Sequence, residues 1–430
     1  MQTLTKWLNT VVNWRIVAAS FFTVPALAQD TTLTLERAQQ LAQQYYPLIR
    51  QKDLVKQTAD LTIDNISKGY LPQVTIAGQA TYQSAVTSVP VKLPGLTIED
   101  PSKDQYKITA EVSQLLYDGG STAAQKNIQQ VNALVDNQKN EVELYKVRER
   151  INQLYLGILL LDEQVKQTEL LKKDIRLGIQ RVTAQVQNGT SLRSNQLVLE
   201  AELLKNEQRS IELAANRKAL VDVLSLFINR SLPASLQLET PLIAESQPAM
   251  IKRPELQLFS YQDSLFKVQQ QVVNAKNRPR TSLFVQGGYG RPGLNMLKNQ
   301  FDWFYIGGIR LNWSLGNLYT SKKEKQLLEV NQRMVDVQKD VFLLNTSTQL
   351  KQQESEFLKL QQLIGTDQQI IDLRNRVKEA ANAQLENGII TANDFLREVN
   401  AEDQARLLLI THRLQLLQAR INYQTIAGNQ

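Results

Sequence analysis

The chain has 430 residues, with 49 Lys and Arg against 42 Asp and Glu, a net charge of +7, and no cysteine. The basic residues form no block, so the charge gives no reason to expect nucleic acid as a partner. Without cysteine there is neither a disulfide framework nor a thiolate metal site, and one histidine, His412, lacks partners for a metal site. No catalytic set of Ser, His and Asp and no phosphate-binding loop is present, so we expect neither an enzyme nor a cofactor.

The N-terminal 28 residues have the pattern of a cleaved signal peptide. Lys6 and Arg15 precede an apolar run at 16–24, which ends in a small-residue site at 26–28. The run is too short to span a membrane as a helix, and polar sequence follows it directly. Beyond it the sequence nowhere holds 18 consecutive apolar residues, so we expect any membrane span of the mature chain to be made of strands.

One pattern of landmarks occurs twice along the chain. Pro47 and Pro72 lie 25 residues apart, and so do Pro254 and Pro279. The landmarks are Tyr46-Pro47, Gly69-Tyr70-Leu71-Pro72, Asp118-Gly119-Gly120 and Asn188-Gly189, then Arg253-Pro254, Asn277-Arg278-Pro279, Leu315-Gly316 and Asn387-Gly388. We therefore predict an internal duplication. Its divisions are a signal peptide (1–28), a first structural repeat (29–230), an inter-repeat linker (231–252) and a second structural repeat (253–430).

Each repeat is predicted to hold the same elements in the same order: a short helix, two strands, a long helix and a shorter helix. In the first repeat we expect them at about 35–68, 73–83, 106–113, 122–188 and 192–229. In the second repeat we expect them at 254–276, 283–289, 305–313, 320–387 and 392–427. The segments 84–105 and 290–302 are predicted to be loops that join the strands of each pair.

The long helices carry apolar residues at alternating intervals of three and four, which is the pattern of a coiled-coil seam. The seam of the first long helix begins with Ile151, Leu154, Ile158, Leu161 and Val165 and continues through Ile175, Ile179, Val182 and Val186. The second long helix has Leu327, Val330, Met334, Val337, Val341 and Leu344. A helix of some 67 residues is about 100 Å long, which is far beyond the size of a compact core.

Each long helix is predicted to end at Asn-Gly and to turn into the next helix, so two long helical hairpins are expected. The first tip contains Asn188, Gly189 and Thr190, and the second contains Asn387 and Gly388. At the second tip we expect Thr391 to cap the new helix and Asp394 to stabilise its first turn. The first tip has Leu192 and Asn195 at these two positions, so the two tips need not dock alike.

Apolar and polar residues alternate along the predicted strands, and the apolar positions are rich in Gly, Ala and aromatic residues. The first strand, for example, has Val74, Ile76, Gly78, Ala80 and Tyr82 on one face. The aromatic residues near strand ends are Tyr82, Tyr106, Tyr289, Tyr305 and Trp313. Runs of about 8 to 11 residues with aromatic ends are typical of strands that cross a bilayer as part of a barrel.

Four strands are too few to close a barrel, and an open edge in lipid leaves amide groups without partners. We therefore expect the chain to pool its strands with copies of itself in a ring. The smallest ring with a water-filled interior has three chains, which gives a 12-stranded β-barrel with four strands per chain. The predicted fold class is an α+β membrane protein, in which this trimeric barrel continues into a long α-helical coiled-coil tunnel.

Several short motifs in this order resemble the TolC-type outer-membrane efflux proteins, the outer membrane factor family. They are Tyr70-Leu71-Pro72-Gln73, Tyr117-Asp118-Gly119-Gly120, Arg253-Pro254-Glu255-Leu256, and Thr391, Asp394, Phe395 and Leu396 after Gly388. The resemblance covers about residues 30–427. It implies a homotrimer in the outer membrane with a periplasmic helical extension. It also implies a role as exit duct in efflux or type I secretion, with a periplasmic adaptor and an inner-membrane RND, ABC or MFS pump as partners.

By position, the resemblance implies a periplasmic gate near the inner end of the second long helix. Asp372, Arg376 and Glu379 lie there on one polar stripe. We predict that Glu379, together with Asp372, contributes to a charged ring that favours cations. An ordinary solvated helix face is the alternative for these residues.

Two other functions also fit parts of the pattern. A periplasmic adaptor has a coiled-coil hairpin, but usually one hairpin inserted in globular β-domains, whereas here two hairpins alternate with two strand pairs. A structural coiled-coil protein of the envelope is the other alternative. The cargo stays open among drugs, metal ions, siderophores and polypeptides.

Overall fold

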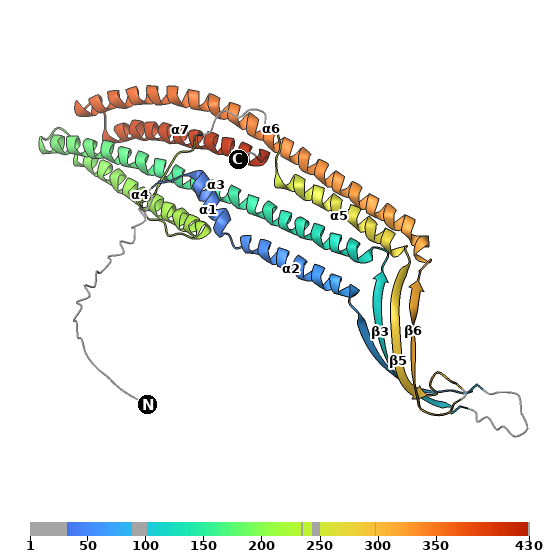
Figure 1. The fold of residues 1–430 in the computed structure, drawn as a ribbon. Coiled ribbons are helices and arrows are strands. Elements are labelled where there is room, and N and C mark those ends of the chain that lie inside the picture. The colour runs from blue at the N-terminus through green and yellow to red at the C-terminus, as the bar shows by residue number, and fades with distance from the viewer. Residues whose placement is uncertain (1–31, 88–100, 234, 243–249, 297, 429–430) are drawn as a thin grey trace, which may run out of the picture.

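The computed structural model describes residues 32–87, 101–233, 235–242, 250–296 and 298–428. Long helices run side by side through most of the molecule, and a sheet lies beyond one end of them (Figure 1). The helices are α1 (Leu35–Tyr45), α2 (Ile49–Ser67), the short η1 (Lys68–Tyr70), α3 (Ser121–Gln187), α4 (Arg193–Ile228), α5 (Pro254–Lys276), α6 (Asn317–Glu386) and α7 (Ala392–Ala427). The strands are β1 (Thr32–Leu33), β2 (Gln73–Tyr82), β3 (Asp104–Tyr117), β4 (Gln237–Leu238), β5 (Arg280–Arg291) and β6 (Asp302–Asn312). The signal peptide predicted for 1–28 lies outside the described residues.

The predicted helix at 35–68 is wrong as a single element, because the chain forms α1 and α2 there. Helix α1 ends at Tyr45, and Tyr46 has extended backbone angles, φ −62° and ψ 131°. Pro47 follows, and the ring of a proline disfavours helical geometry at the residue before it. The strands β3 and β5 also extend beyond their predicted bounds, so the two predicted strand-joining loops are shorter than expected.

The two predicted helical hairpins are confirmed as α3–α4 and α6–α7. Helices α3 and α6 have 67 and 70 residues, whereas α4 and α7 have 36 each. At 1.5 Å per residue the shorter partners reach about half as far. On the half nearer the sheet their place is taken by α2, which packs on α3, and by α5, which packs on both α3 and α6. Across that half the lateral order of helices is therefore α2, α3, α5, α6.

The strands β2, β3, β5 and β6 form an antiparallel sheet in that order. Val74 lies opposite Val112, Val112 opposite Val285, and Val285 opposite Gly307, so the predicted apolar faces of all four strands lie on one side. This register confirms the predicted alternation. In one protomer the apolar side is uncovered, and Tyr305 on it is 83% exposed.

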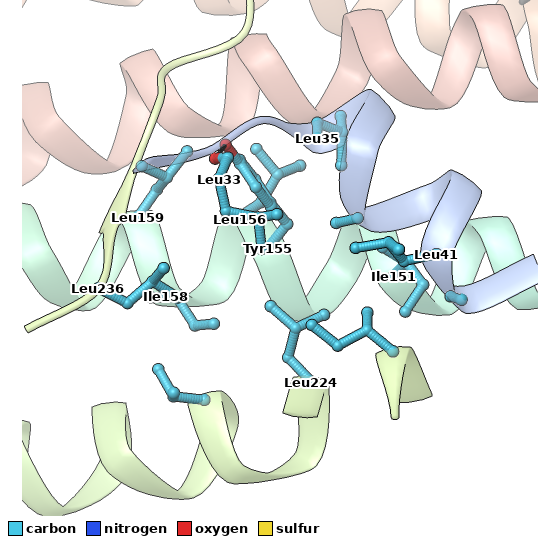
Figure 2. Close-up of a cluster of buried hydrophobic side chains, with 14 of the residues drawn as sticks. Leu33, Leu35, Leu41, Ile151, Tyr155, Leu156, Ile158, Leu159, Leu224 and Leu236 are labelled. Atoms are coloured by element: carbon cyan, nitrogen blue, oxygen red, sulfur yellow. Dashed lines mark hydrogen bonds between the residues drawn. The ribbon is translucent and has the colours of Figure 1, made fainter. Parts of the chain in front are cut away.

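The largest buried cluster lies where α1, α3 and α4 meet (Figure 2). Ile151, Ile158 and Leu224 are completely buried there, and so is the ring of Tyr155. The Tyr155 hydroxyl lies 2.6 Å from the carbonyl oxygen of Leu33 and 2.6 Å from that of Glu239. It thereby joins the ends of β1 and β4, a short parallel pair that the sequence pattern did not indicate.

The two coiled-coil seams have different surroundings in the protomer. Ile151, Ile158 and Val182 of the first seam are fully buried against other parts of the same chain. In contrast, Val337 and Leu344 of the second seam are 60% and 67% exposed. Helix α6 therefore keeps an apolar stripe whose side chains stay 42% to 67% exposed in the protomer.

Candidate functional site: the paired hairpin tips

The two hairpin tips have the same backbone geometry at the end of the long helix. Gly189 and Gly388 have φ values of 72° and 67°, in the left-handed region that glycine adopts without strain. The N–H of Thr190 donates to the carbonyl of Gln185 at 2.8 Å, and the equivalent bond at the second tip, from Ile389 to the residue-384 carbonyl, is also 2.8 Å long. Each glycine N–H donates to the carbonyl three positions before it, at 3.1 Å. This pair of bonds is the Schellman motif, which satisfies the last carbonyl groups of a helix.

The helices that leave the tips begin differently, as the sequence predicts. At the second tip the N–H of Asp394 donates to the Thr391 hydroxyl at 3.3 Å, and the Thr391 N–H donates back to the Asp394 carboxylate at 3.2 Å. This reciprocal pair is a capping box. The hydrogen bonds from the Thr391 hydroxyl and backbone lower the pKa of Asp394. Leu192, at the first tip, provides no side-chain cap.

Side chains of the first hairpin tie the two tips together. The Asn195 carboxamide oxygen accepts the N–H of Ala392 at 3.4 Å, and its amide group donates to the Ser191 hydroxyl at 3.2 Å. The Gln185 amide donates at 2.9 and 3.0 Å to the last two carbonyl oxygens of α6. Arg181 forms an ion pair with Glu386 at 2.9 Å. Asn195 of the first tip thus supports the start of α7 as well as the turn that leads into its own helix.

Apolar side chains from four helices pack directly behind the tips. Phe395 of α7 is 3% exposed, and its ring lies so near Gly178 of α3 that a Cβ there would approach it to 3.2 Å. Val182, Leu199 and Leu385 are buried in the same cluster. The cluster joins α3, α4, α6 and α7, so the two tips form one packed unit.

The three predicted gate residues lie on α6 beside this unit, and all three are exposed. The Gln368 amide donates to the Asp372 carboxylate at 3.3 Å, and the Asn375 amide donates to Glu379 at 3.1 Å. Glu379 also lines a cavity of about 120 Å³ between α3, α6 and α7. Arg376 forms no ion pair with either carboxylate among the residues that the structure describes. The structure thus brings Asp372, Arg376 and Glu379 onto one open stripe without linking them to one another.

A network of charges near the tips centres instead on Lys378, which is half-buried and which the sequence reasoning did not single out. Its ammonium group lies 3.0 Å from the Asp174 carboxylate of α3 and 3.4 Å from that of Glu402 on α7. Glu402 is 3% exposed and also pairs with Arg406. Asp174 is 204 positions away in the chain, so no local spacing could have identified this contact.

Aromatic side chains gather at both ends of the sheet's apolar face. Tyr289 stacks on Phe301 with ring centroids 5.5 Å apart and contacts Trp303 at 4.9 Å. Near the helices, the Trp313 indole donates to the carbonyl of Asn277 at 3.0 Å. Trp303, which the sequence reasoning missed, is 78% exposed on this face. Trp303 lies two positions before Tyr305, so the period of a strand places both on one face, and this spacing could have identified it from the sequence.

No helix in the described ranges is both long and apolar enough to cross a lipid bilayer. Within the same ranges, no three His, Cys, Asp or Glu side chains come together in a group that could hold a metal ion.

The comparisons with known proteins concern the fold. No protein-family model matches the sequence, and no curated protein matches it. Among solved structures, CusC, described for transmembrane channel formation, is 15% identical with a TM-score of 0.68, and the match covers 92% of each chain. The outer membrane protein VceC of Vibrio cholerae is 13% identical with a TM-score of 0.66, over 92% of this chain and 96% of VceC. The MtrE outer membrane channel of Neisseria gonorrhoeae is 14% identical with a TM-score of 0.64, over 92% and 89%.

These matches extend over the sheet, both hairpins and the helices between them, because they leave out only a small fraction of the chain. The sheet and the two long helical hairpins are therefore matched together, as one architecture, by each of these solved structures. The chain has the fold of the TolC-type outer-membrane factor channels.

Proposed function

We propose that this protein is an outer-membrane channel-tunnel, the exit duct of a tripartite efflux or type I secretion system. The observation that carries the proposal is the sheet: one face is apolar and exposed, and the other is polar. Ile76 and Ile309, on the apolar face, are 73% and 68% exposed. An uncovered apolar face of this extent is rare in soluble monomers and fits lipid contact.

The height of the apolar face agrees with an outer membrane. Trp303 and Trp313 are ten positions apart on β6 and just beyond it. Ten residues of strand reach about 33 Å, and a tilt of about 40° reduces the height to about 25 Å, the apolar band of an outer-membrane barrel. Aromatic residues near both ends would then lie at the two lipid–water interfaces.

The edges of the protomer support closure by copies of the same chain. The edge strands are β2 and β6, and on the sheet-side half the edge helices are α2 and α6. Leu54 and Leu61 of α2, one heptad apart, are each 60% exposed, as is Val337 of the α6 stripe. In a ring, β6 and α6 of one protomer would meet β2 and α2 of the next. Three protomers would form a twelve-stranded barrel and a coiled-coil tunnel, with each of the two proposed repeats (29–230 and 253–430) supplying an equivalent unit.

The tips would be the periplasmic end of this tunnel, where an adaptor docks and an inner-membrane pump delivers cargo. Their common Schellman geometry would present six similar loops in a trimer, while the capping box at Thr391 would distinguish three of them. Export to the envelope rests on the signal-peptide pattern of residues 1–28. The protein would act passively, without catalysis.

Fractionation and conductance test the proposal together. We expect the protein to sediment with the outer membrane on a sucrose gradient and to form ion-conducting pores in planar bilayers. Sedimentation with the inner membrane would favour an adaptor instead. Outer-membrane localisation without any conductance would favour a structural coiled-coil protein.

The gate hypothesis has its own test in the same recordings. Glu379→Ala is expected to change single-channel conductance and to reduce the preference for cations, because it would remove three carboxylates from the narrowest part of the tunnel. Asp372→Ala should have a smaller effect in the same direction. Unchanged conductance and selectivity in both variants would show that these residues form an ordinary solvated face.

Capture at the tips would identify the docking partner. Ile389, which is 70% exposed and next to Gly388, can be replaced by cysteine without disturbing the left-handed glycine. Because the chain has no other cysteine, a crosslinker on Ile389→Cys acts at one position only. We expect it to capture a periplasmic adaptor. The same substitution at Tyr319, which is 88% exposed at the opposite end of α6, is the control and should not capture it.

A further inference from the structure

The polar face of the sheet carries five charged side chains in an uneven arrangement. Because alternate residues share a face, the register places them together on the side opposite Tyr305 and Ile309. The five are Lys107, Glu111, Arg280, Asp302 and Arg310. If three chains close a barrel as proposed above, this face lines the water-filled interior.

Two of these charges neutralise each other. The Arg310 guanidinium lies 2.9 and 3.3 Å from the two carboxylate oxygens of Glu111. Gln286 of the intervening strand donates to the same carboxylate at 3.4 Å, and the guanidinium also stacks on the Phe284 ring at 4.3 Å. This group spans three strands, and its net charge is zero.

Lys107 is held on the same face without such a partner. Its ammonium group lies 4.7 Å from the centre of the Phe304 ring, and no carboxylate of the described residues lies within 4.0 Å of it. Two glycines make this position possible. A Cβ on Gly288 would lie 2.4 Å from Phe304, and one on Gly290 would lie 3.3 Å from the Lys107 side chain. The Phe304 ring thus occupies the space that a side chain at position 288 would need, and the lysine stem passes close to Gly290.

The two remaining charges are too distant to neutralise Lys107. Gly290 of β5 lies opposite Lys107 on one side and opposite Asp302 on the other. Lys107 and Asp302 are therefore two strand spacings apart, or about 10 Å. That separation is more than the Debye length at physiological salt, which is about 8 Å. The Asp302 carboxylate also accepts the N–H of Trp303 at 2.9 Å. Arg280 lies at the opposite end of β5, next to the helices.

We propose that Lys107 attracts anions inside the barrel, and that three copies form an anion-favouring region near its outer end. The inference rests on the proposed channel function and goes beyond it, because it assigns a charge preference to the exit end. Cargo would meet the predicted carboxylate gate first and the lysines last. Anionic groups such as carboxylates and phosphates would be favoured at the lysines.

A single cysteine beside Lys107 can report the local potential. Thr109 is the next residue of β3 on the same face, and the chain contains no cysteine of its own. The full-length trimer carrying Thr109→Cys is treated with an anionic and with a cationic methanethiosulfonate, and each rate is divided by the rate with a free thiol in solution. We expect the anionic reagent to be favoured. Adding Lys107→Gln should lower the anionic-to-cationic ratio about fivefold at low salt, which corresponds to one charge about 7 Å away in water.

The matched control is Lys103→Gln, which removes the same charge from the segment before β3, outside the sheet. It should leave the ratio unchanged, and 1 M salt should abolish the effect of Lys107→Gln because the Debye length falls to about 3 Å. A ratio that is insensitive to Lys107→Gln, while both reagents react, would overturn the inference and leave the channel intact. Failure of both reagents to react would show that the face is not open to water, which overturns the channel function as well.

Discussion

The apolar stripe of α6 offers the sharpest test of ring closure. Val337 and Leu344 lie one heptad apart and are 60% and 67% exposed in the protomer. We predict that Val337→Glu prevents trimer formation while the protomer keeps its fold, because most of the changed side chain is exposed in the protomer.

The expected magnitude follows from the exposed fraction of Val337. A fully buried Val contributes about 1.5–3 kcal/mol, so burying the exposed three-fifths of this one at an interface contributes roughly 1–2 kcal/mol. The substitution by Glu removes this contribution and adds a carboxylate that must be desolvated without a partner. We therefore expect it to weaken the association free energy by about 3 kcal/mol per interface. Three equivalent interfaces give about 9 kcal/mol per trimer, or roughly six orders of magnitude in the association constant.

Light scattering coupled to size-exclusion chromatography in detergent gives the mass of the assembly, and circular dichroism gives the helix content. Val337→Glu should run as a protomer with unchanged helicity. Gln338→Glu, which introduces the same charge one position further along α6 and off the stripe, should remain trimeric. A trimer formed by Val337→Glu as tightly as by the wild type would refute the assignment of this stripe to the interface.

Three further predictions concern the helices and turns. Burial raises the pKa of Asp403, because the folded state favours the neutral carboxyl over the charged one. The free energy of unfolding is therefore highest at low pH, where the carboxyl is protonated, and falls as pH rises through that raised pKa. Asp403→Asn, which keeps the 2.9 Å acceptor for Gln167, should therefore raise the denaturation midpoint at pH 7 but not at about pH 3. Gly119→Ala should lower the thermal midpoint far more than Gly388→Ala: both have positive φ, but only at Gly119 would a Cβ lie 2.8 Å from a carbonyl oxygen of α5. Thr391→Ala should accelerate amide exchange in the first turn of α7 alone, and equal exchange in wild type and variant would mean that the capping box does not stabilise that turn.

Local signals were sufficient for most of the secondary structure. The long helices end at Asn-Gly because glycine adopts the left-handed conformation that closes a Schellman motif, and both tips show it. The strand faces follow from a period of two, which is a property of the extended backbone itself. The break at Tyr46-Pro47 was also encoded locally, but the helical pattern on both sides concealed it.

The candidate site was predictable only in part. Thr391 and Asp394 interact across three positions of one helix start, so the capping box could be deduced from spacing. Lys378 could not be deduced, because its partner Asp174 belongs to the other hairpin. The same holds for Asn195, whose carboxamide supports the start of α7.

The sequence by itself determined the order of the main helices and strands, which strand face is apolar, and how the tips turn, because these depend on interactions within a few residues. Only the tertiary structure showed that the first seam is buried inside the protomer whereas the second, around Val337, is exposed. It also showed that Lys107 lies on Phe304 without a carboxylate close by in the described chain. These properties depend on which segments meet across the fold, and a heptad or an alternating pattern contains no information about the partner that covers it.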